Sequence, residues 1–286
     1  MIDFSVLVNG LLLSSLYALI AMGFTMIFGI GGVLNVAHGA SITVGGFAMY
    51  YTTSTFGLNP WYGALAALIV PGIFSAVVYV GLVRWIEDDP IIVVITTLLV
   101  LLLIERSFLL VAGSQGKVVP SLISGQLEIG SISVGLNRVL AFVVSWILIL
   151  ALLYFVERTR MGTAIRALSM SERGSALAGI NEFRISVMTW FIAGVLAGAA
   201  GLFLGTFQTV GWDMGLDPLL LGFAIVIFGG LGSIRGSVIA AYIIGFIDVL
   251  TTTYVDATLT GMSAFIILMV ILIARPEGLF GHAEVS

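Results

Sequence analysis

Long apolar segments, separated by short polar ones, account for most of the chain. Within them apolar residues follow one another continuously, unlike the alternation of a half-buried strand or the one-sided pattern of a surface helix. A helix needs about 20 apolar residues to cross about 30 Å of hydrocarbon, and most of the segments come close to that length. The pattern predicts membrane spans at residues 5–29, 36–55, 61–83, 91–112, 138–156, 186–208, 218–232, 236–254 and 261–274.

Two of these segments differ from the rest. Residues 36–55 contain Gly39, Gly45 and Gly46 together with several hydroxyls, and residues 218–232 are short and end in a glycine-rich stretch. Glycine weakens a helix interior, so either segment fits a broken or re-entrant helix. The prediction is an all-α polytopic membrane protein with about eight or nine transmembrane helices, some broken or re-entrant, and a short cytoplasmic helix.

Composition supports the membrane assignment and excludes several classes of protein. Of the 286 residues, 60% are apolar and 9% are charged, and the mean hydropathy is +1.19. A soluble domain carries roughly 25% charged residues, and an outer-membrane barrel would show segments of alternating polarity. The 35 glycines favour closely packed helices. The absence of cysteine excludes disulfides, thiolate metal sites and cysteine nucleophiles.

The basic residues predict the orientation in the membrane. The loop of residues 157–185 holds five of the eleven: Arg158, Arg160, Arg166, Arg173 and Arg184. The positive-inside rule places that loop in the cytoplasm, and counting spans from it makes residues 113–137 external and the C-terminus cytoplasmic. Arg84, Arg235 and Arg275 agree with this orientation. Strand-like pieces are expected in the external loop at residues 126–129 and 131–134.

The cytoplasmic loop is predicted to contain a short helix over residues 171–178. The four residues that begin at Ser169 fit a capping box, in which the Ser169 hydroxyl accepts a helix N–H and Glu172 reaches back. Gly179 suits the position just beyond the last turn. The pattern by itself fits both a solvated connector and a docking helix for a cytoplasmic partner.

The sixth predicted span carries four glycines, at Gly194, Gly198, Gly201 and Gly205. Their spacing of four, three and four residues places them on one helix face, where neighbouring backbones can approach closely. We interpret this face as a helix-packing surface and not as a ligand site.

Charged residues inside spans cost roughly 2.5–3.5 kcal/mol each at a helix centre, so they are candidates for function. Glu105 and Arg106 lie late in the fourth span, where both are expected to extend towards the outer interface. Asp248 lies in the eighth span. Thr96 and Thr97, nearer the inner end of the fourth span, are weaker candidates.

Asn35, His38 and Gly39 lie together where the first span meets the second. A lone histidine is more often structural than a ligand, but the glycines nearby suggest an opened helix whose backbone dipoles face a pathway. Gly229 and Gly230 mark a second break of this kind. The candidate pathway residues are therefore Asn35, His38, Thr96, Thr97, Gly229 and Gly230.

The motifs of a catalytic site are missing. Lys117 is the single lysine and has no surrounding phosphate-binding loop, so the chain is not expected to hydrolyse ATP. Two histidines, His38 and His282, form no zinc motif. The sequence predicts no enzyme activity, no catalytic residue, no metal, no cofactor and no nucleic-acid partner.

Several motifs resemble the branched-chain amino-acid ABC transporter permease family of the LivH type. The resemblance extends over nearly the whole chain, and its first and last blocks are the most specific. The motifs are residues 9–11, 17–23, 28–29, Asn35-Val36-Ala37-His38-Gly39, 160–167, 178–181, 228–233 and 275–281.

The resemblance implies that residues 1–286 form one transmembrane permease domain of an ATP-binding-cassette importer in the inner membrane. The solute would be a branched-chain or related amino acid. The implied partners are a second homologous permease, two cytoplasmic ATPase subunits that hydrolyse the ATP, an external solute-binding protein, the small-molecule solute and membrane lipid.

The resemblance also makes the loop of residues 157–185 the ATPase-coupling element. The coupling residues it implies are Ser169, Glu172, Arg173, Gly174, Ala176, Leu177, Ala178 and Gly179. Such loops often carry paired alanines after the acidic residue, whereas this chain has Gly174, which loosens a helix by about 0.5–1 kcal/mol.

Three alternatives remain open from the sequence. The same family includes permeases for urea and short amides. An ion-gradient-driven secondary transporter would use intramembrane acids such as Glu105 and Asp248. A membrane-embedded enzyme would need a nucleophile–base pair or a metal cluster, which the sequence does not offer.

Overall fold

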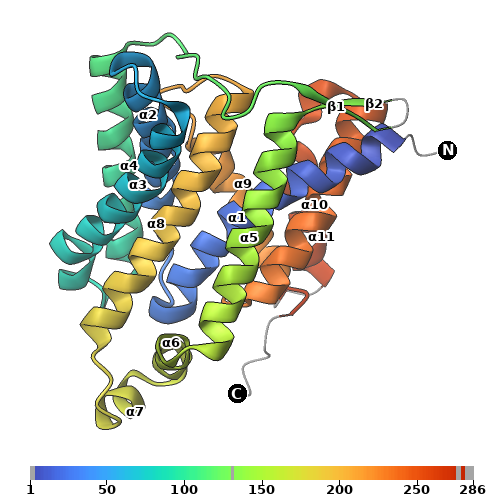
Figure 1. Cartoon of the computed structure of the whole chain (residues 1–286). Helices are drawn as coiled ribbons and strands as arrows, with labels where there is room; N and C mark the ends of the chain where they lie inside the picture. The colour runs from blue at the N-terminus through green and yellow to red at the C-terminus, as the bar shows by residue number, and fades with distance from the viewer. Residues whose placement is uncertain (1–3, 130–131, 275–277, 281–286) are drawn as a thin grey trace.

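The computed structural model describes residues 4–129, 132–274 and 278–280, and these are predominantly helical (Figure 1). The all-α prediction is confirmed. The α-helices are α1 (Phe4–Gly31), α2 (Ala37–Tyr50), α3 (Pro60–Gly81), α4 (Pro90–Ala112), α5 (Leu136–Arg158), α6 (Arg160–Met170), α7 (Glu172–Leu177), α8 (Glu182–Phe207), α9 (Leu216–Gly229), α10 (Ile234–Tyr254) and α11 (Met262–Ala274). The short elements are η1 (Tyr51–Thr55), η2 (Val83–Trp85), η3 (Ala257–Leu259), β1 (Gln126–Ile129) and β2 (Ile132–Gly135).

An apolar helix occupies each of the nine predicted spans in the described part of the chain. Six of them are long and apolar enough to cross a membrane: α1, α3 with η2, α4, α5, α8 and α10. Helix α9 has 14 residues and α11 has 13. At 1.5 Å per residue each measures about 20 Å, less than the hydrocarbon thickness. Helix α2 has 14 residues but continues without a break into the five π-helical residues of η1, up to Thr55. The prediction of a shortened segment is therefore supported at residues 218–232.

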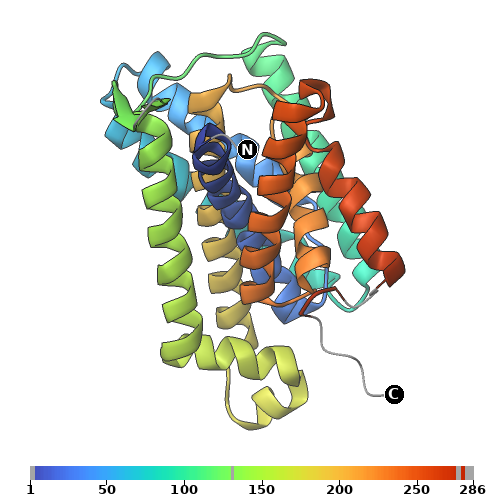
Figure 2. The same cartoon turned by 90° about the vertical axis from the view of Figure 1, so that its right-hand side faces the viewer.

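The two ends of the bundle differ (Figures 1 and 2). Helices α6 and α7 lie at one end, beyond the last residue of α5, and we call this the α6–α7 end. The strands β1 and β2 and the start of α1 lie at the other, which we call the hairpin end. The strands pair antiparallel, with Gln126 opposite Gly135, so the strand-like pieces expected in the external loop are confirmed.

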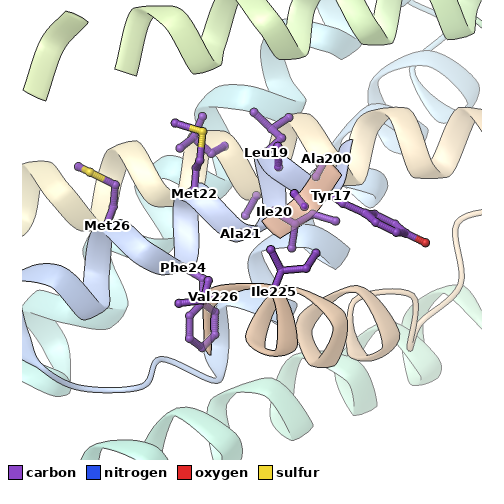
Figure 3. Packing of buried hydrophobic residues seen from close by; sticks show 14 of the residues in the cluster. Tyr17, Leu19, Ile20, Ala21, Met22, Phe24, Met26, Ala200, Ile225 and Val226 are labelled. Carbon is purple, nitrogen blue, oxygen red and sulfur yellow. The ribbon is translucent and has the colours of Figure 1, made fainter. Parts of the chain in front are cut away.

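Helices α1 and α8 form the centre of the bundle. In their most apolar stretches 78% and 67% of the residues are buried, compared with 28% for α4 and for α5. Helix α1 packs against α5, α8, α9 and α10, so the first helix of the chain contacts helices from its second half. Figure 3 shows side chains leaving α1 on all sides, among them Leu19, Met22 and Phe24, with Ala200 of α8 and Ile225 of α9 close by.

The glycine face of α8 is a packing surface, as the sequence predicted. A Cβ placed on Gly194 or Gly198 would collide with main-chain oxygens of α3, and one on Gly201 with the Ile42 carbonyl of α2. One on Gly205 would meet Val210. The absence of side chains therefore allows α8 to touch α2 and α3 backbone to backbone.

The helix starts follow from capping residues in the sequence. Asn59 and Asp89 accept hydrogen bonds from first-turn N–H groups of α3 and α4, and each is followed by a proline at the first helical position. Near the hairpin end, Asp256 accepts bonds of 2.8 Å from the Thr258 amide and hydroxyl, which lower the pKa of that exposed carboxyl.

Candidate coupling surface and pathway residues

Helix α7 begins at a different residue from the one predicted. Ser171 is the N-cap, and its Oγ accepts a hydrogen bond of 3.0 Å from the Gly174 amide. Ser169 lies within α6, and its hydroxyl donates to the Arg166 carbonyl at 2.9 Å. The prediction of a capping box at Ser169 was therefore wrong. An N-cap needs an extended backbone, and the first residue after α6 with that conformation is Ser171, at φ −166° and ψ 111°.

The predicted end of α7 is confirmed. Gly179 has φ +75° and donates from its amide to Ala176 O at 3.0 Å, while the Ile180 amide donates to Ser175 O at 3.0 Å. These two bonds form a Schellman motif, which requires a left-handed residue and so favours glycine. The motif closes α7 after two turns and directs the chain into α8.

Residues around α7 are mostly exposed at the tip of the α6–α7 end (Figure 1). Met170 and Leu177 are 86% and 85% exposed, and Ser175 is the buried residue of the turn. The predicted coupling residues whose side chains are described are all exposed: Ser169, Arg173, Gly174, Ala176, Leu177, Ala178 and Gly179. Large apolar side chains in water, rimmed by polar groups, are typical of a protein-interaction surface.

Helix α6 connects α7 to the bundle. It is amphipathic, with Gly162, Ile165 and Leu168 buried on one face, and it contacts α1, α5 and α8. A Cβ on Gly162 would collide with the carbonyls of Phe155 and Val156, so this glycine lets α6 lie directly against the last turn of α5. Helix α6 therefore links α7 to three membrane helices.

A second group of predicted residues meets inside the bundle. The Val36 amide donates to Thr97 Oγ1 at 3.1 Å, which joins the start of α2 to α4. His38 is fully buried, and its Nε2 lies 3.2 Å from Ile20 O of α1. A carbonyl is an acceptor, so this bond requires the proton on Nε2 and leaves Nδ1 as an acceptor. Thr96 is half-buried beside Thr97.

Two buried acceptors in this group lack a partner among the described residues. They are Nδ1 of His38 and Oδ1 of Asn35, whose residues are 0% and 2% exposed. Gly39 lies within the first turn of α2, where it allows close contact with Gly215 at the start of α9. Two helix N-termini and two unsatisfied acceptors therefore lie close together in the protein interior, which is a polar environment among apolar helices.

Gly229 is the last residue of α9, and Gly230 begins the turn between α9 and α10. Gly230 has φ +97°, and Gly229 packs against Gly236 so closely that a Cβ would collide with it. The carbonyls of Phe228 and Gly229 accept hydrogen bonds from Leu279 and Phe280. The contacts described for this turn are therefore with the backbone of the same chain.

The charged residues inside the spans, Glu105, Arg106 and Asp248, differ in their exposure and in their contacts. Glu105 was expected to extend towards the interface, but it is 4% exposed and its Oε1 has no hydrogen-bond partner among the described residues. That expectation was wrong, because the residue faces the bundle and not the lipid. Arg106 is exposed, with its guanidinium 5.2 Å from the Trp212 ring. Asp248 accepts from Tyr17 Oη at 2.8 Å and from the Gly261 amide at 2.7 Å.

A family model described as "Branched-chain amino acid transport system / permease component" matches residues 6–274. The chain belongs to this family. The resemblance found in the sequence is therefore confirmed, and the chain is a multi-pass transport permease of the ABC transporter type. The described residues contain no group of metal-ligating side chains.

Two amino-acid permeases match this chain along almost their whole length, and a sugar permease matches along three quarters of its own. The high-affinity branched-chain amino acid transport permease LivH of Escherichia coli K12 is 29% identical over 97% of this chain and 95% of its own. BraD of Pseudomonas aeruginosa, a permease of the same description, is 29% identical over 98% and 96%. The fructose import permease FruF of Bifidobacterium longum is 30% identical over 91% and 74%. No solved structure matches the chain significantly.

The sequence did not reveal one feature of this permease, a cavity of about 510 Å3 at the α6–α7 end between α1, α5, α6 and α10. Arg158, Arg166 and Arg235 line it, and Arg235 forms an ion pair with Glu157 across it. Arg158 and Arg166 were recognised as part of a basic loop, but Arg235 lies 69 residues beyond Arg166 in the sequence. Only folding brings these arginines around one space.

Proposed function

We propose that this permease is one of two homologous membrane subunits of an importer for a branched-chain or related amino acid, with ATP hydrolysed on separate cytoplasmic subunits. The observation that carries the proposal is the exposed α7 surface around Leu177, which is connected through α6 to α1, α5 and α8. The match to the relatives LivH and BraD also supports the proposal.

The proposed orientation places the α6–α7 end in the cytoplasm and the hairpin end outside. Arginines of the α6–α7 end support it under the positive-inside rule: Arg84, Arg158, Arg160, Arg166, Arg173, Arg184 and Arg235. An ATPase docked on α7 would then push on α6. Such a partner biases the balance between inward-open and outward-open arrangements, because it binds one of them more tightly.

The solute is proposed to pass the polar group at the start of α2. An amino acid carries an ammonium and a carboxylate, and both charges need partners while they cross a medium of low dielectric constant. The unpartnered acceptors of Asn35 and His38 suit the ammonium, and helix N-termini suit the carboxylate. Thr96, Thr97, Gly229 and Gly230 are the other proposed pathway residues.

The solute class rests on the names of the relatives, and these include a sugar permease as well as amino-acid permeases. The hydroxyl groups of a sugar and the N–H groups of urea or an amide can donate to the same acceptors. We propose the amino acid because LivH and BraD match along 95% and 96% of their own length, whereas FruF matches along 74%.

The test is uptake into membrane vesicles that contain this permease together with its co-purifying subunits. We expect uptake of leucine, isoleucine or valine that requires ATP and persists when proton and sodium gradients are abolished. His38→Ala and Asn35→Ala should each lower uptake by about tenfold or more, the loss of one hydrogen bond to a charged group.

Thr43→Ala is the matched control, since Thr43 is a buried polar residue of α2 whose hydroxyl is satisfied by Gly39 O within the helix. Uptake driven by an ion gradient without ATP would contradict the importer. Uptake unchanged by both His38→Ala and Asn35→Ala would exclude these residues from the pathway.

A further inference from the structure

The cavity at the α6–α7 end lies between α5 and α10, where Glu157 of α5 pairs with Arg235 of α10. Outside the cavity lining, the same two helices are also joined by Trp146 Nε1 of α5, which donates to Tyr242 Oη of α10 at 2.8 Å. Helix α1 packs against both α5 and α10 (Figure 2). It contributes Met26 to the cavity lining. The space of about 510 Å3 is within the range of roughly 300–1,000 Å3 found for small-ligand sites.

The charge around this cavity is strongly positive. Among the described residues that line it, Arg158, Arg166 and Arg235 carry guanidinium groups and Glu157 carries the carboxylate. Arg235 directs both Nε, at 3.1 Å, and Nη2 at one Glu157 oxygen. Arg166 contacts the main-chain oxygen of Glu157 at 3.5 Å. One carboxylate cannot balance three guanidinium groups, so the cavity favours an anion.

Apart from the hydroxyl residues Thr25 and Ser233, the side chains of the remaining wall of the cavity are apolar. Met26, Leu153, Val156 and Ile165 line it, and all of these except Leu153 are buried. Outside the cavity, α5 presents an exposed apolar stripe that ends at Arg158, four residues beyond its last member. The stripe consists of Val143, Ile147, Leu150 and Tyr154. Apolar surface and guanidinium groups therefore adjoin along one helix face.

We propose that this cavity binds the phosphate headgroup of an anionic phospholipid from the adjacent leaflet. Arginine forks match phosphate geometry, and basic pockets between transmembrane helices on the cytoplasmic side are suited to such headgroups. The acyl chains lie along the apolar stripe of α5, which adjoins Arg158. The cytoplasmic leaflet as the source rests on the orientation proposed above.

A lipid in this position touches the parts that the proposed coupling would move. Arg158 ends α5, Arg166 belongs to α6, and Arg235 lies in the first turn of α10. A phosphate held by all three binds one arrangement of these helices more tightly than any other, so it stabilises that arrangement.

The experiment is native mass spectrometry of the purified permease with its co-purifying subunits in mixed micelles, without ATP or solute. Phosphatidylglycerol should remain bound at concentrations where phosphatidylcholine does not. The double variant Arg158→Gln/Arg166→Gln should weaken phosphatidylglycerol binding about 30-fold, since each basic residue near an anionic lipid contributes roughly fivefold. Arg184→Gln is the matched control, an exposed arginine of the same end outside the cavity lining, and should leave the affinity unchanged.

A variant that binds the lipid more tightly distinguishes an effect on the binding site from a folding defect. Glu157→Gln removes the competing carboxylate and should tighten phosphatidylglycerol binding about fivefold, which a misfolded chain would not do. The proposal is overturned if the double arginine variant and the control bind phosphatidylglycerol equally, or if phosphatidylcholine binds as tightly as phosphatidylglycerol. Inorganic phosphate that displaces the lipid at equal concentration would also overturn it. Because no ATP or solute is present, these outcomes are independent of whether the chain imports an amino acid.

Discussion

At the α6–α7 end, Leu177 exposes 85% of its surface to solvent and α7 contacts the bundle through α6 and α8. Where α8 crosses α2 and α3, by contrast, glycines bring backbones together, and the Ile42 carbonyl faces Gly201 without an intervening side chain. The α6–α7 end makes few contacts with the rest of the bundle and exposes a large surface. The contact between α8, α2 and α3 leaves no space for a larger side chain.

This difference separates two roles along one chain. Close-packed interiors transmit strain and deform little, so the α2–α3–α8 contact region should move as one unit. A short exposed helix closed by a Schellman motif keeps its own shape while its surroundings change. A push on α7 is therefore expected to move helices relative to one another and not to deform the glycine-packed core.

The largest effect is expected from breaking the core. In Gly201→Leu the new side chain collides with the Ile42 carbonyl, and α2 and α8 must separate. We expect a loss of at least about 3 kcal/mol, the upper range for overpacking, and therefore little folded protein. Yield and elution profile in mild detergent measure it. Gly174→Ala, an exposed glycine of α7, is the control and should elute as the unchanged chain does. A normal profile for Gly201→Leu would contradict the packing described here.

The second-largest effect is expected from changing the exposed surface of α7. Leu177→Glu should leave the thermal unfolding temperature unchanged, because the side chain is 85% exposed, and lower solute-stimulated ATP hydrolysis at least tenfold. A charge in the centre of an apolar contact is poorly tolerated. Leu231→Glu is the control, since Leu231 is 47% exposed in the turn between α9 and α10. Equal hydrolysis in both variants would remove α7 as the docking site.

The smallest effect distinguishes the observed cap from the predicted one. Ser171→Ala removes the acceptor for the Gly174 amide, at a cost of about 1 kcal/mol that is confined to α7. Ser169→Ala removes a bond within α6 and should leave α7 unchanged. Hydrogen exchange of the α7 amides measures both. Faster exchange after Ser169→Ala and not after Ser171→Ala would reverse the assignment.

Local features of the fold were predictable where a residue acts on its own neighbours. The glycine face of α8 and the left-handed Gly179 depend on spacings of a few residues, and the structure has both of them. The predicted cap of α7 was wrong because a capping box requires Glu or Gln three residues later, which Ser169 has and Ser171 lacks. Which one is the cap depends on where α6 ends.

Long-range features were not predictable in the same way. Glu105 looked like an interfacial residue because it lies late in a span, but the rotation of α4 turns it into the bundle. The cavity joins arginines from three segments, and the contact between the start of α2 and α4 joins residues 36 and 97. No periodicity in the sequence reports which faces of two helices meet.

The sequence by itself determined that this protein is a helical membrane protein of the branched-chain amino acid permease family, because long apolar segments have one stable form in lipid and the family motifs are local. The tertiary structure alone decided which polar atoms are left without partners and which arginines share a space. Those properties depend on the rotation and tilt of each helix, and helices in lipid acquire these by fitting small side chains against neighbouring backbones.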